Sequence, residues 1–278
     1  MFNSTSRATI SKWTGNLVLL AYLLFTVIPI AWFLLASIEP PAAIQSPNPF
    51  SRFTPTLQNY IDVFAKLNLM RFILNSLIIC AASTLISIVA GVPAAYGFAR
   101  LKTRNMERLS LWILSNRMLP PIAVVIPLYL LLGRIGLLDT RIGLIIIYSA
   151  FNLPYVVWTL ISFFEDIPIE LDEAAALDGS SLFGVLYRIM VPIAAPGIIA
   201  TAIFAFILCW SEFLFAVIFT SSTAQTLPVA IASFVTDRGI EWGRMSAAGS
   251  VLIVPLTVLF YSIQRFLIRG LSFGAVSG

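Results

Sequence analysis

Long apolar runs dominate the chain, and short polar segments separate them. Residues 17–38 form the first run, which holds 22 residues and no charge. At 1.5 Å per residue a helix of this length reaches about 33 Å, enough to cross the hydrocarbon core of a bilayer. Comparable runs occupy residues 75–98, 109–132, 142–164, 197–219 and 247–266. Runs of this length are too long for barrel strands, so the pattern predicts an all-α integral membrane protein with six transmembrane helices.

The composition supports a membrane protein and excludes several kinds of chemistry. Hydrophobic residues make up 59% of the 278 residues, and charged residues only 11%, against about 25% in soluble domains. The absence of histidine removes the commonest metal ligand and general base. Cys80 and Cys209 both lie in apolar runs and are too few for a disulfide framework or a zinc site. We therefore expect no catalytic residue, no metal site and no cofactor bound by this chain.

Charge predicts the orientation of the six runs. An even number of spans places both termini on one side of the membrane. The densest basic cluster, Arg100, Lys102, Arg104 and Arg108, marks a cytoplasmic connection. The expected organisation is a cytoplasmic tail at 1–16, a first span at 17–38, an external loop at 39–74 with a short helix near 57–64, a five-helix core at 75–266 with a cytoplasmic loop at 165–196, and a cytoplasmic tail at 267–278.

The segment 165–196 is polar enough to lie in water and carries helix signals, but it is too short for a soluble domain. Pro168 suits a first helical turn, where its missing N–H needs no partner. Acidic residues follow where the helix dipole favours negative charge, at Glu170, Asp172 and Glu173. Gly179 then predicts a left-handed helix end. A helix with this ending is the size of a docking element for another protein.

A second helix is predicted after the glycine. Ser180 or Ser181 would begin it, and we expect Pro192 with Pro196 to end it, since proline interrupts a helical hydrogen-bond ladder. The segment therefore forms a helix, a glycine turn and a helix between two membrane spans.

Residues in this segment resemble a known motif. The spacing of Glu173-Ala174-Ala175, Gly179, Ile189 and Pro192 is similar to the EAA loop of ABC importer permeases. In that family the loop forms coupling helices that sit in a cleft of the cytoplasmic ATPase subunit. The alternative is an ordinary interhelical loop. The resemblance implies an ATPase-coupling role for Glu170, Glu173, Ala174, Ala175, Asp178, Gly179, Ile189 and Pro192.

Polar residues inside the apolar runs are candidates for the solute pathway. A charge within a span costs about 2.5–3.5 kcal/mol on insertion scales, so Arg117 either reaches the headgroups or faces protein or water. The third run is interrupted at residues 116–121, and Pro120 and Pro121 there free backbone carbonyls, which favours a cavity beside Arg117. Glu212 forms either a structural ion pair or hydrogen bond, or accepts from solute hydroxyls. Trp210 would stack on the solute or simply pack. The candidates are Asn116, Arg117, Asn152, Trp210 and Glu212.

Several segments together resemble one group of transporters. The strings NRMLPP, FNLP, WSEFLF and GLSFGAV, with the EAA motif, are similar to those of maltose-type, carbohydrate-uptake permeases of bacterial ABC importers, over residues 57–278. Two positions depart from that pattern: Ser211, where asparagine is common, and Ser277, where lysine is usual. The resemblance implies the type I ABC importer permease fold, and leaves open whether the solute is a sugar, a sugar acid, a polyol or a sugar sulfonate.

The same resemblance implies the partners and the compartment. It implies a second permease subunit in a heterodimer, an ATPase dimer that uses ATP and Mg, and an external solute-binding protein, with no nucleic acid. The chain would lie in the bacterial cytoplasmic (inner) membrane with both termini in the cytoplasm. An ion-coupled transporter and a channel are the alternatives. The first usually has several carboxylates in its spans, whereas only Glu212 qualifies here. The second needs a filter or a ring of charges.

Overall fold

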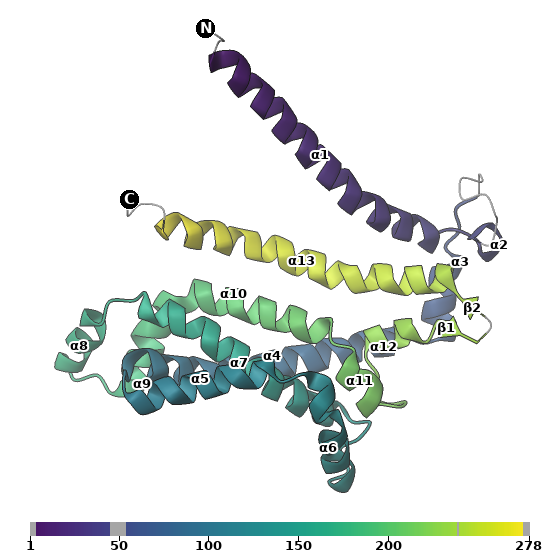
Figure 1. The fold of residues 1–278 in the computed structure, drawn as a ribbon. Coiled ribbons are helices and arrows are strands. Elements are labelled where there is room, and N and C mark those ends of the chain that lie inside the picture. Colours follow the sequence, from purple (N-terminus) through teal and green to yellow (C-terminus); the bar gives the residue numbers. More distant parts are fainter. Residues whose placement is uncertain (1–3, 45–53, 238, 275–278) are drawn as a thin grey trace. The chain divides into compact units, whose positions relative to one another are not determined.

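The computed structural model describes residues 4–44, 54–237 and 239–274, and most of them are helical. A two-stranded antiparallel sheet, β1 (Val235–Thr236) and β2 (Gly239–Ile240), pairs Val235 with Ile240. The helical elements are α1 (Ser4–Ser37), α2 (Pro41–Ile44), α3 (Gln58–Ile61), η1 (Asp62–Lys66), α4 (Leu69–Arg100), α5 (Arg104–Met118), α6 (Pro121–Arg134), α7 (Arg141–Glu165), α8 (Glu170–Leu177), α9 (Leu182–Val185), η2 (Leu186–Met190), α10 (Val191–Trp210), α11 (Leu214–Phe219), α12 (Leu227–Ala232) and α13 (Trp242–Gly274) (Figure 1).

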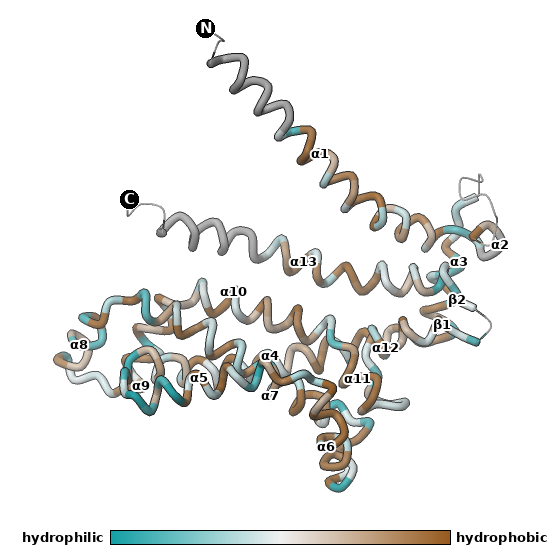
Figure 2. The backbone as a smooth tube through the Cα atoms, viewed as in Figure 1, coloured by the Kyte–Doolittle hydropathy of each residue, from teal (hydrophilic) through white to brown (hydrophobic). Residues whose placement is uncertain are grey.

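The described residues contain the expected membrane spans. Five stretches are long and apolar enough to cross a bilayer: Gly15–Ser37, Leu69–Arg100, Arg141–Glu165, Leu182–Trp210 and Trp242–Ser262. A sixth is the pair α5 and α6, which passes the same test but bends by 92° between them. Figure 2 shows apolar residues along these helices and hydrophilic residues gathered around α8 and α9. Counting the bent pair as one span, the prediction of an all-α fold with six spans is confirmed.

Helices extend beyond the apolar runs that predicted them. Helix α1 begins at Ser4 rather than near residue 17, and α4 begins at Leu69 rather than at residue 75. At the other end of the chain α13 continues to Gly274, so most of the expected tail at 267–278 is helical, while Ser277 lies outside the described residues. Helix propagation adds one hydrogen bond for each residue ordered, whatever its polarity. Hydropathy therefore marks the part of a helix that meets lipid, and not where the helix ends.

The fifth span differs most from the expectation of a helix at 197–219. Pro192 and Pro196 do not end the preceding helix, because the chain stays helical from Leu182 to Trp210. The wide turn η2 lies immediately before Pro192, and the Val191 N–H bonds to the carbonyl of Leu186, five residues back. A π-helical turn at this place re-forms the ladder ahead of the proline. The helix then stops at Trp210, and α11 begins only at Leu214.

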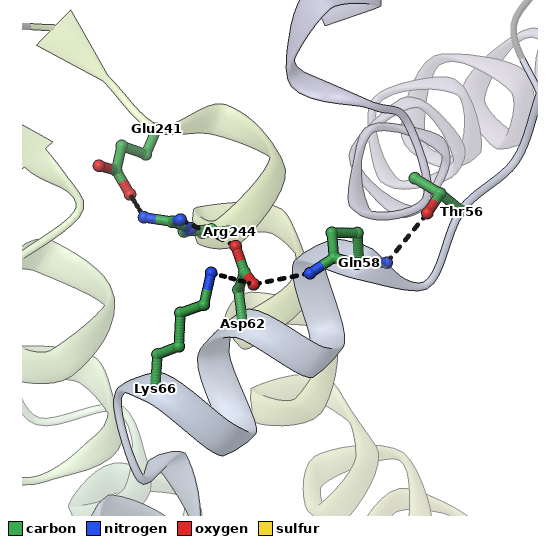
Figure 3. A network of polar contacts seen from close by, with 6 residues as sticks. All are labelled: Thr56, Gln58, Asp62, Lys66, Glu241 and Arg244. Carbon is green, nitrogen blue, oxygen red and sulfur yellow. Dashed lines mark hydrogen bonds and ion pairs between the residues drawn. The ribbon is translucent and has the colours of Figure 1, made fainter.

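The chain divides into two compact units, residues 1–69 with 231–251, and residues 70–230 with 252–278. In the first unit, Asp62 joins η1 to the start of α13 (Figure 3). Its carboxylate pairs with Lys66 at 2.8 Å and with Arg244 at 2.8 Å, and it accepts a hydrogen bond from Gln58 at 2.9 Å. The hydrogen bonds from Lys66, Arg244 and Gln58 hold the pKa of Asp62 well below its usual range.

The second unit is built on α4, α7 and α10. Helices α7 and α10 pack along each other (Figure 1). Gly91 marks a close approach of α4 to α7, since a Cβ at this position would lie 2.5 Å from Cγ1 of Val156. The buried core of this unit includes Val92, Ala95, Ala99, Val156, Val157, Leu160, Phe164, Met190, Ala194 and Ala205.

One carboxylate fastens the loop that follows α11. Asp139, at a left-handed φ of 53°, accepts hydrogen bonds from the backbone N–H groups of Ser221, Ser222, Thr223 and Ala224, at 2.9 to 3.2 Å. Burial opposes its ionisation, but the hydrogen bonds from Thr223, Ser222 and Ala224 outweigh it and hold the pKa of Asp139 well below its usual range.

Asn75 supports the same loop from α4. Its Nδ2 donates to the carbonyls of Thr223 (2.9 Å) and Gln225 (2.8 Å), and its Oδ1 accepts from Nε of Arg141 (2.8 Å). Segments about 150 positions apart in the sequence are thus held together by polar contacts at one end of the second unit.

We expect Asp139→Ala to destabilise the folded protein by about 1.5–3 kcal/mol, because it leaves backbone donors of residues 221–224 without their charged acceptor. Thermal unfolding in detergent measures the change. Asp166→Ala is the control, since the exposed Asp166 carboxylate has no hydrogen bond among the described residues. The folded-state pKa of Asp139 is lowered, so its contribution is complete above the unfolded pKa of about 3.9 and is lost as the pH falls below it. An Asp139→Ala midpoint equal to that of Asp166→Ala contradicts the anchoring role.

Candidate functional site

The loop between α7 and α10 contains the turn that the sequence predicted. Helix α8 has acidic residues in its first turn, where its N-terminus favours them. It ends in a left-handed Gly179 with φ of 79°. The Gly179 N–H bonds to the carbonyl of Ala176, and the Ser180 N–H to that of Ala175, both at 3.0 Å. This is the Schellman pattern, which satisfies the last carbonyls of a helix, so the predicted glycine stop is confirmed.

The second helix of the loop begins at one of the two expected serines. Ser181 caps α9, since its Oγ accepts from the Gly184 N–H at 3.2 Å. Pro168 precedes α8 by two positions, and its carbonyl accepts from the Leu171 N–H at 3.3 Å.

The turn between α8 and α9 exposes apolar side chains. Leu177 is 89% exposed, Leu182 78% and Phe183 73%. Among the predicted coupling residues, Glu170, Glu173, Ala174, Asp178 and Gly179 are exposed on the same segment, and Pro192 is exposed at the start of α10. We call Glu173, Ala174, Leu177, Asp178, Leu182 and Phe183 the α8–α9 surface.

Two of the predicted coupling residues lie inward instead. Ala175 is buried, and Ile189 is half-buried in η2 against the core of the second unit. The sequence analysis did not select Leu177, Leu182 or Phe183. A large apolar side chain in a segment otherwise rich in polar residues could have indicated a contact surface. Large exposed apolar side chains next to exposed acidic residues are typical of a surface that another protein covers.

A second feature is a cavity of about 260 Å³ among the spans, mostly apolar in its lining, which we call the polar cavity after the polar side chains in its wall. Its polar side chains come from three elements: Arg117 from α5, Tyr148 and Asn152 from α7, and Glu212 from the break after α10. Apolar residues, including Leu119, Phe151 and Leu208, complete the lining. Three of the five predicted pathway residues therefore meet in one cavity.

Glu212 lies in the break between α10 and α11, and not within a continuous fifth span as expected. Its carboxylate accepts from the backbone N–H of Phe215 (2.9 Å) and of Ala216 (3.3 Å), and from the hydroxyl of Tyr148 (2.7 Å). Breaking a helix frees donors that lipid cannot satisfy. The Glu212 carboxylate accepts hydrogen bonds from these freed donors. It also links the break to α7 through Tyr148, a residue that the sequence analysis missed.

Arg117 lies one residue before the end of α5, next to the 92° bend. Its guanidinium carbon lies 4.9 Å from the centre of the Tyr155 ring. No carboxylate of the described residues forms an ion pair with it. It lines the polar cavity and a neighbouring cavity of about 340 Å³, which Asn116 also lines. Asn116 donates to the carbonyl of Trp112 at 2.9 Å. The guanidinium N–H groups of Arg117 therefore border the two cavities and are not paired with a carboxylate of the described residues.

Asn152 and Trp210 are buried, and both are held by hydrogen bonds. Asn152 is buried, and its Nδ2 donates to the carbonyl of Ala205 (3.0 Å) and to Sγ of Cys209 (2.9 Å). Trp210 is 1% exposed, donates to the carbonyl of Leu252 at 3.1 Å, and stacks on Phe206. Trp210 is not among the residues that line either cavity. Its surroundings favour packing over stacking on a sugar.

The described residues contain no group of three or more histidine, cysteine, aspartate or glutamate side chains placed to hold a metal ion. The chemistry available in the polar cavity is hydrogen bonding, by a guanidinium, a hydroxyl, an amide and a carboxylate.

Comparisons with known proteins agree with this arrangement. Residues 87–273 match the family described as binding-protein-dependent transport system inner membrane component. The chain is 34% identical over 252 residues to the sulfoquinovosyl glycerol transport system permease protein of Agrobacterium fabrum, covering 90% of this chain and 88% of that one. It is 33% identical to the trehalose/maltose transport system permease protein of Thermococcus litoralis, covering 90% and 91%.

A solved structure shares the fold. A chain of a bacterial ABC transporter involved in the import of the acidic polysaccharide alginate superposes with a TM-score of 0.78. The alignment covers 95% of this chain and 98% of that chain, at 20% identity.

Proposed function

Because the chain belongs to the family of inner membrane components of binding-protein-dependent transport systems, we propose that it is the transmembrane permease subunit of an ATP-driven ABC importer. It forms half of the translocation pathway for a sugar or a sugar-like solute. The observation that carries this proposal is the family match over residues 87–273, which includes both the α8–α9 surface and the polar cavity. The named solutes of two relatives, sulfoquinovosyl glycerol and trehalose/maltose, support a sugar.

Three partners complete the proposed machine: a second permease subunit in a heterodimer, a dimer of ATPase subunits, and an external solute-binding protein. The permease itself is not catalytic. Its sequence has no GxxxxGK[ST] phosphate-binding loop, so ATP and Mg belong to the ATPase. The α8–α9 surface, with exposed Leu177, Leu182 and Phe183 beside acidic Glu173 and Asp178, has the character of a docking site for that subunit.

The helices beside the docking loop also form the cavity. The stretch Leu182–Trp210 is continuous, and at 1.5 Å per residue its 29 residues reach about 40 Å. It begins at the α8–α9 surface and ends at the break that holds Glu212. Helix α7 leads from Tyr148 and Asn152 to the other end of the same loop. A displacement of the loop by an ATPase therefore moves both walls of the cavity.

The polar groups of the cavity suit a solute rich in hydroxyls. Arg117 offers donors, the Glu212 carboxylate accepts, and the Tyr148 hydroxyl, whose proton is donated to Glu212, can also accept. A sugar hydroxyl also donates and accepts, so it can bridge groups of either kind. The apolar lining, with Phe151 and Leu208, provides contact for the ring.

Reconstitution tests the function. The chain, with its partner permease, ATPase and binding protein in liposomes, should take up labelled solute only when ATP and the binding protein are both supplied. Uptake driven by a proton or sodium gradient without ATP would instead establish an ion-coupled transporter, and passive flux would establish a channel.

The orientation is also a proposal, and cysteine labelling tests it. We expect both termini, residues 100–108 and the loop 165–196 to face the cytoplasm, because the basic cluster favours that side. Ser180→Cys should resist a membrane-impermeant maleimide added to spheroplasts, and Ser221→Cys should react. Both positions are exposed, and the native Cys80 and Cys209 are buried. The opposite labelling pattern overturns the orientation.

We expect Gly179→Val to insert normally but to weaken docking of the ATPase. A side chain in the left-handed region costs about 1–2 kcal/mol, and a Cβ at residue 179 meets nothing within 4 Å in this chain, so the strain falls on the turn itself. Co-purification of the ATPase and solute uptake measure the effect. Gly179→Asn is the matched control, because asparagine tolerates this conformation. Wild-type docking and uptake in Gly179→Val would refute the role of the turn.

We expect Arg117→Lys to insert and assemble normally yet to transport poorly. A residue that only reaches headgroups can be replaced by lysine, which has the same charge and a long stem. Lysine cannot replace an arginine whose planar guanidinium group binds the solute or a gate. Uptake and the ATPase rate with and without binding protein, in one preparation, measure the outcome. If both equal the wild-type values, Arg117 is an interface anchor and leaves the set of pathway residues.

A further inference from the structure

Arg100, the last residue of α4, binds three separate acceptors at the base of the α8–α9 loop. Its Nε pairs with Oδ2 of Asp172 at 2.8 Å. Its Nη1 donates to the carbonyl of Phe164 at 2.8 Å, and its Nη2 to that of Ile167 at 3.0 Å. The side chains of Arg100 and Asp172 are 13% and 15% exposed, so water competes little for these bonds.

The acceptors belong to different elements. Phe164 is in the last turn of α7 and Ile167 lies two residues beyond the helix, where the last helix carbonyls lack partners within the helix and the dipole is negative. Asp172 lies in the first turn of α8. The Arg100 guanidinium on α4 therefore donates to carbonyls at the end of α7 and forms an ion pair with α8 at the same time.

Asp172 is held from a second direction. The hydroxyl of Tyr96, one turn earlier on α4, donates to its Oδ1 at 2.5 Å. Each carboxylate oxygen thus has a donor from α4. The next residues, Glu173 and Ala174, are exposed, because successive helical positions are turned by about 100°. Helix α8 therefore has one side bound to the spans and another that forms part of the α8–α9 surface.

We propose that Arg100 is a positioning residue that locks α8 to α4 and α7, so that movement imposed on the α8–α9 surface reaches the spans instead of bending the loop. This inference rests on the proposed importer function. The planar guanidinium group of arginine is needed because three acceptors that lie in different directions must receive hydrogen bonds at once. Lysine concentrates its charge at one point and cannot span them.

Arg100 differs in this respect from the basic residues that follow it. Lys102, Arg104 and Arg108 are exposed, and none of them forms an ion pair with a described carboxylate. They provide the charge that orients a membrane loop, and that role needs no fixed geometry. Arg104 is therefore a matched control for Arg100, with the same charge in the same connection.

The experiment compares Arg100→Gln, Arg100→Lys and Arg104→Gln in the complete importer reconstituted in liposomes. The readout is the number of solute molecules transported per ATP hydrolysed, with assembled complex quantified separately. For Arg100→Gln we expect this ratio to fall by about tenfold or more, with ATP hydrolysis that depends less on binding protein. Arg100→Lys should fall between Arg100→Gln and wild type, and Arg104→Gln should match wild type.

The ratio separates positioning from mere stability. If Arg100 only stabilises the fold, its variants yield less complex, but each surviving complex transports the wild-type number of molecules per ATP, and the inference is overturned. If Arg100→Gln does not assemble, Asp172→Asn decides the matter, because it keeps the side-chain shape and removes the charge. The inference then requires a lowered ratio in Asp172→Asn. If the wild-type complex shows no uptake that depends on ATP and binding protein, the proposed function itself is refuted.

Discussion

A backbone group inside a bilayer must find a hydrogen-bond partner within the protein, and this constraint governs where the helices of this chain can break. There are two such places beside the polar cavity, the bend of 92° at Pro120 and the interruption between Trp210 and Leu214. At the second, Glu212 accepts from two of the freed backbone donors and ties them to Tyr148. The cavity lies where the helices are interrupted, and the Glu212 carboxylate that satisfies the freed backbone donors forms part of its wall.

The apolar pattern predicted much of the fold. Six spans, the interruption near Pro120 and the left-handed Gly179 all follow from local rules: burial in lipid, the missing N–H of proline and the freedom of glycine. Hydropathy, however, measures contact with lipid and carries no information on the direction of the chain. The prolines predicted an interruption of the third span at residues 116–121 but not its angle, and hydropathy carried the fifth span straight through Glu212.

Proline also misled the prediction, for a local reason. Pro192 was expected to end a helix, because in a regular α-helix its ring collides with the preceding turn. One wider turn, η2, removes that conflict and keeps the helix continuous to Trp210. The residues that hold the structure together were missed for a different reason. Tyr148 and Glu212 are 64 positions apart, and Arg100 and Asp172 are 72 apart, so only the fold reveals that they meet.

Continuity through Pro192 bears directly on the proposed mechanism. Had the helix ended there, a flexible joint would separate the α8–α9 surface from the span, and force on the loop would be absorbed by the joint. Instead a single helix runs from Leu182 to the edge of the cavity, while the carbonyl end of α7 is closed by Arg100. Packed helices change position as units and do not deform continuously. In the proposed importer, an ATPase bound to the exposed turn can thus move both α7 and α10. Their displacement changes the shape of the cavity at the interruption that contains Glu212.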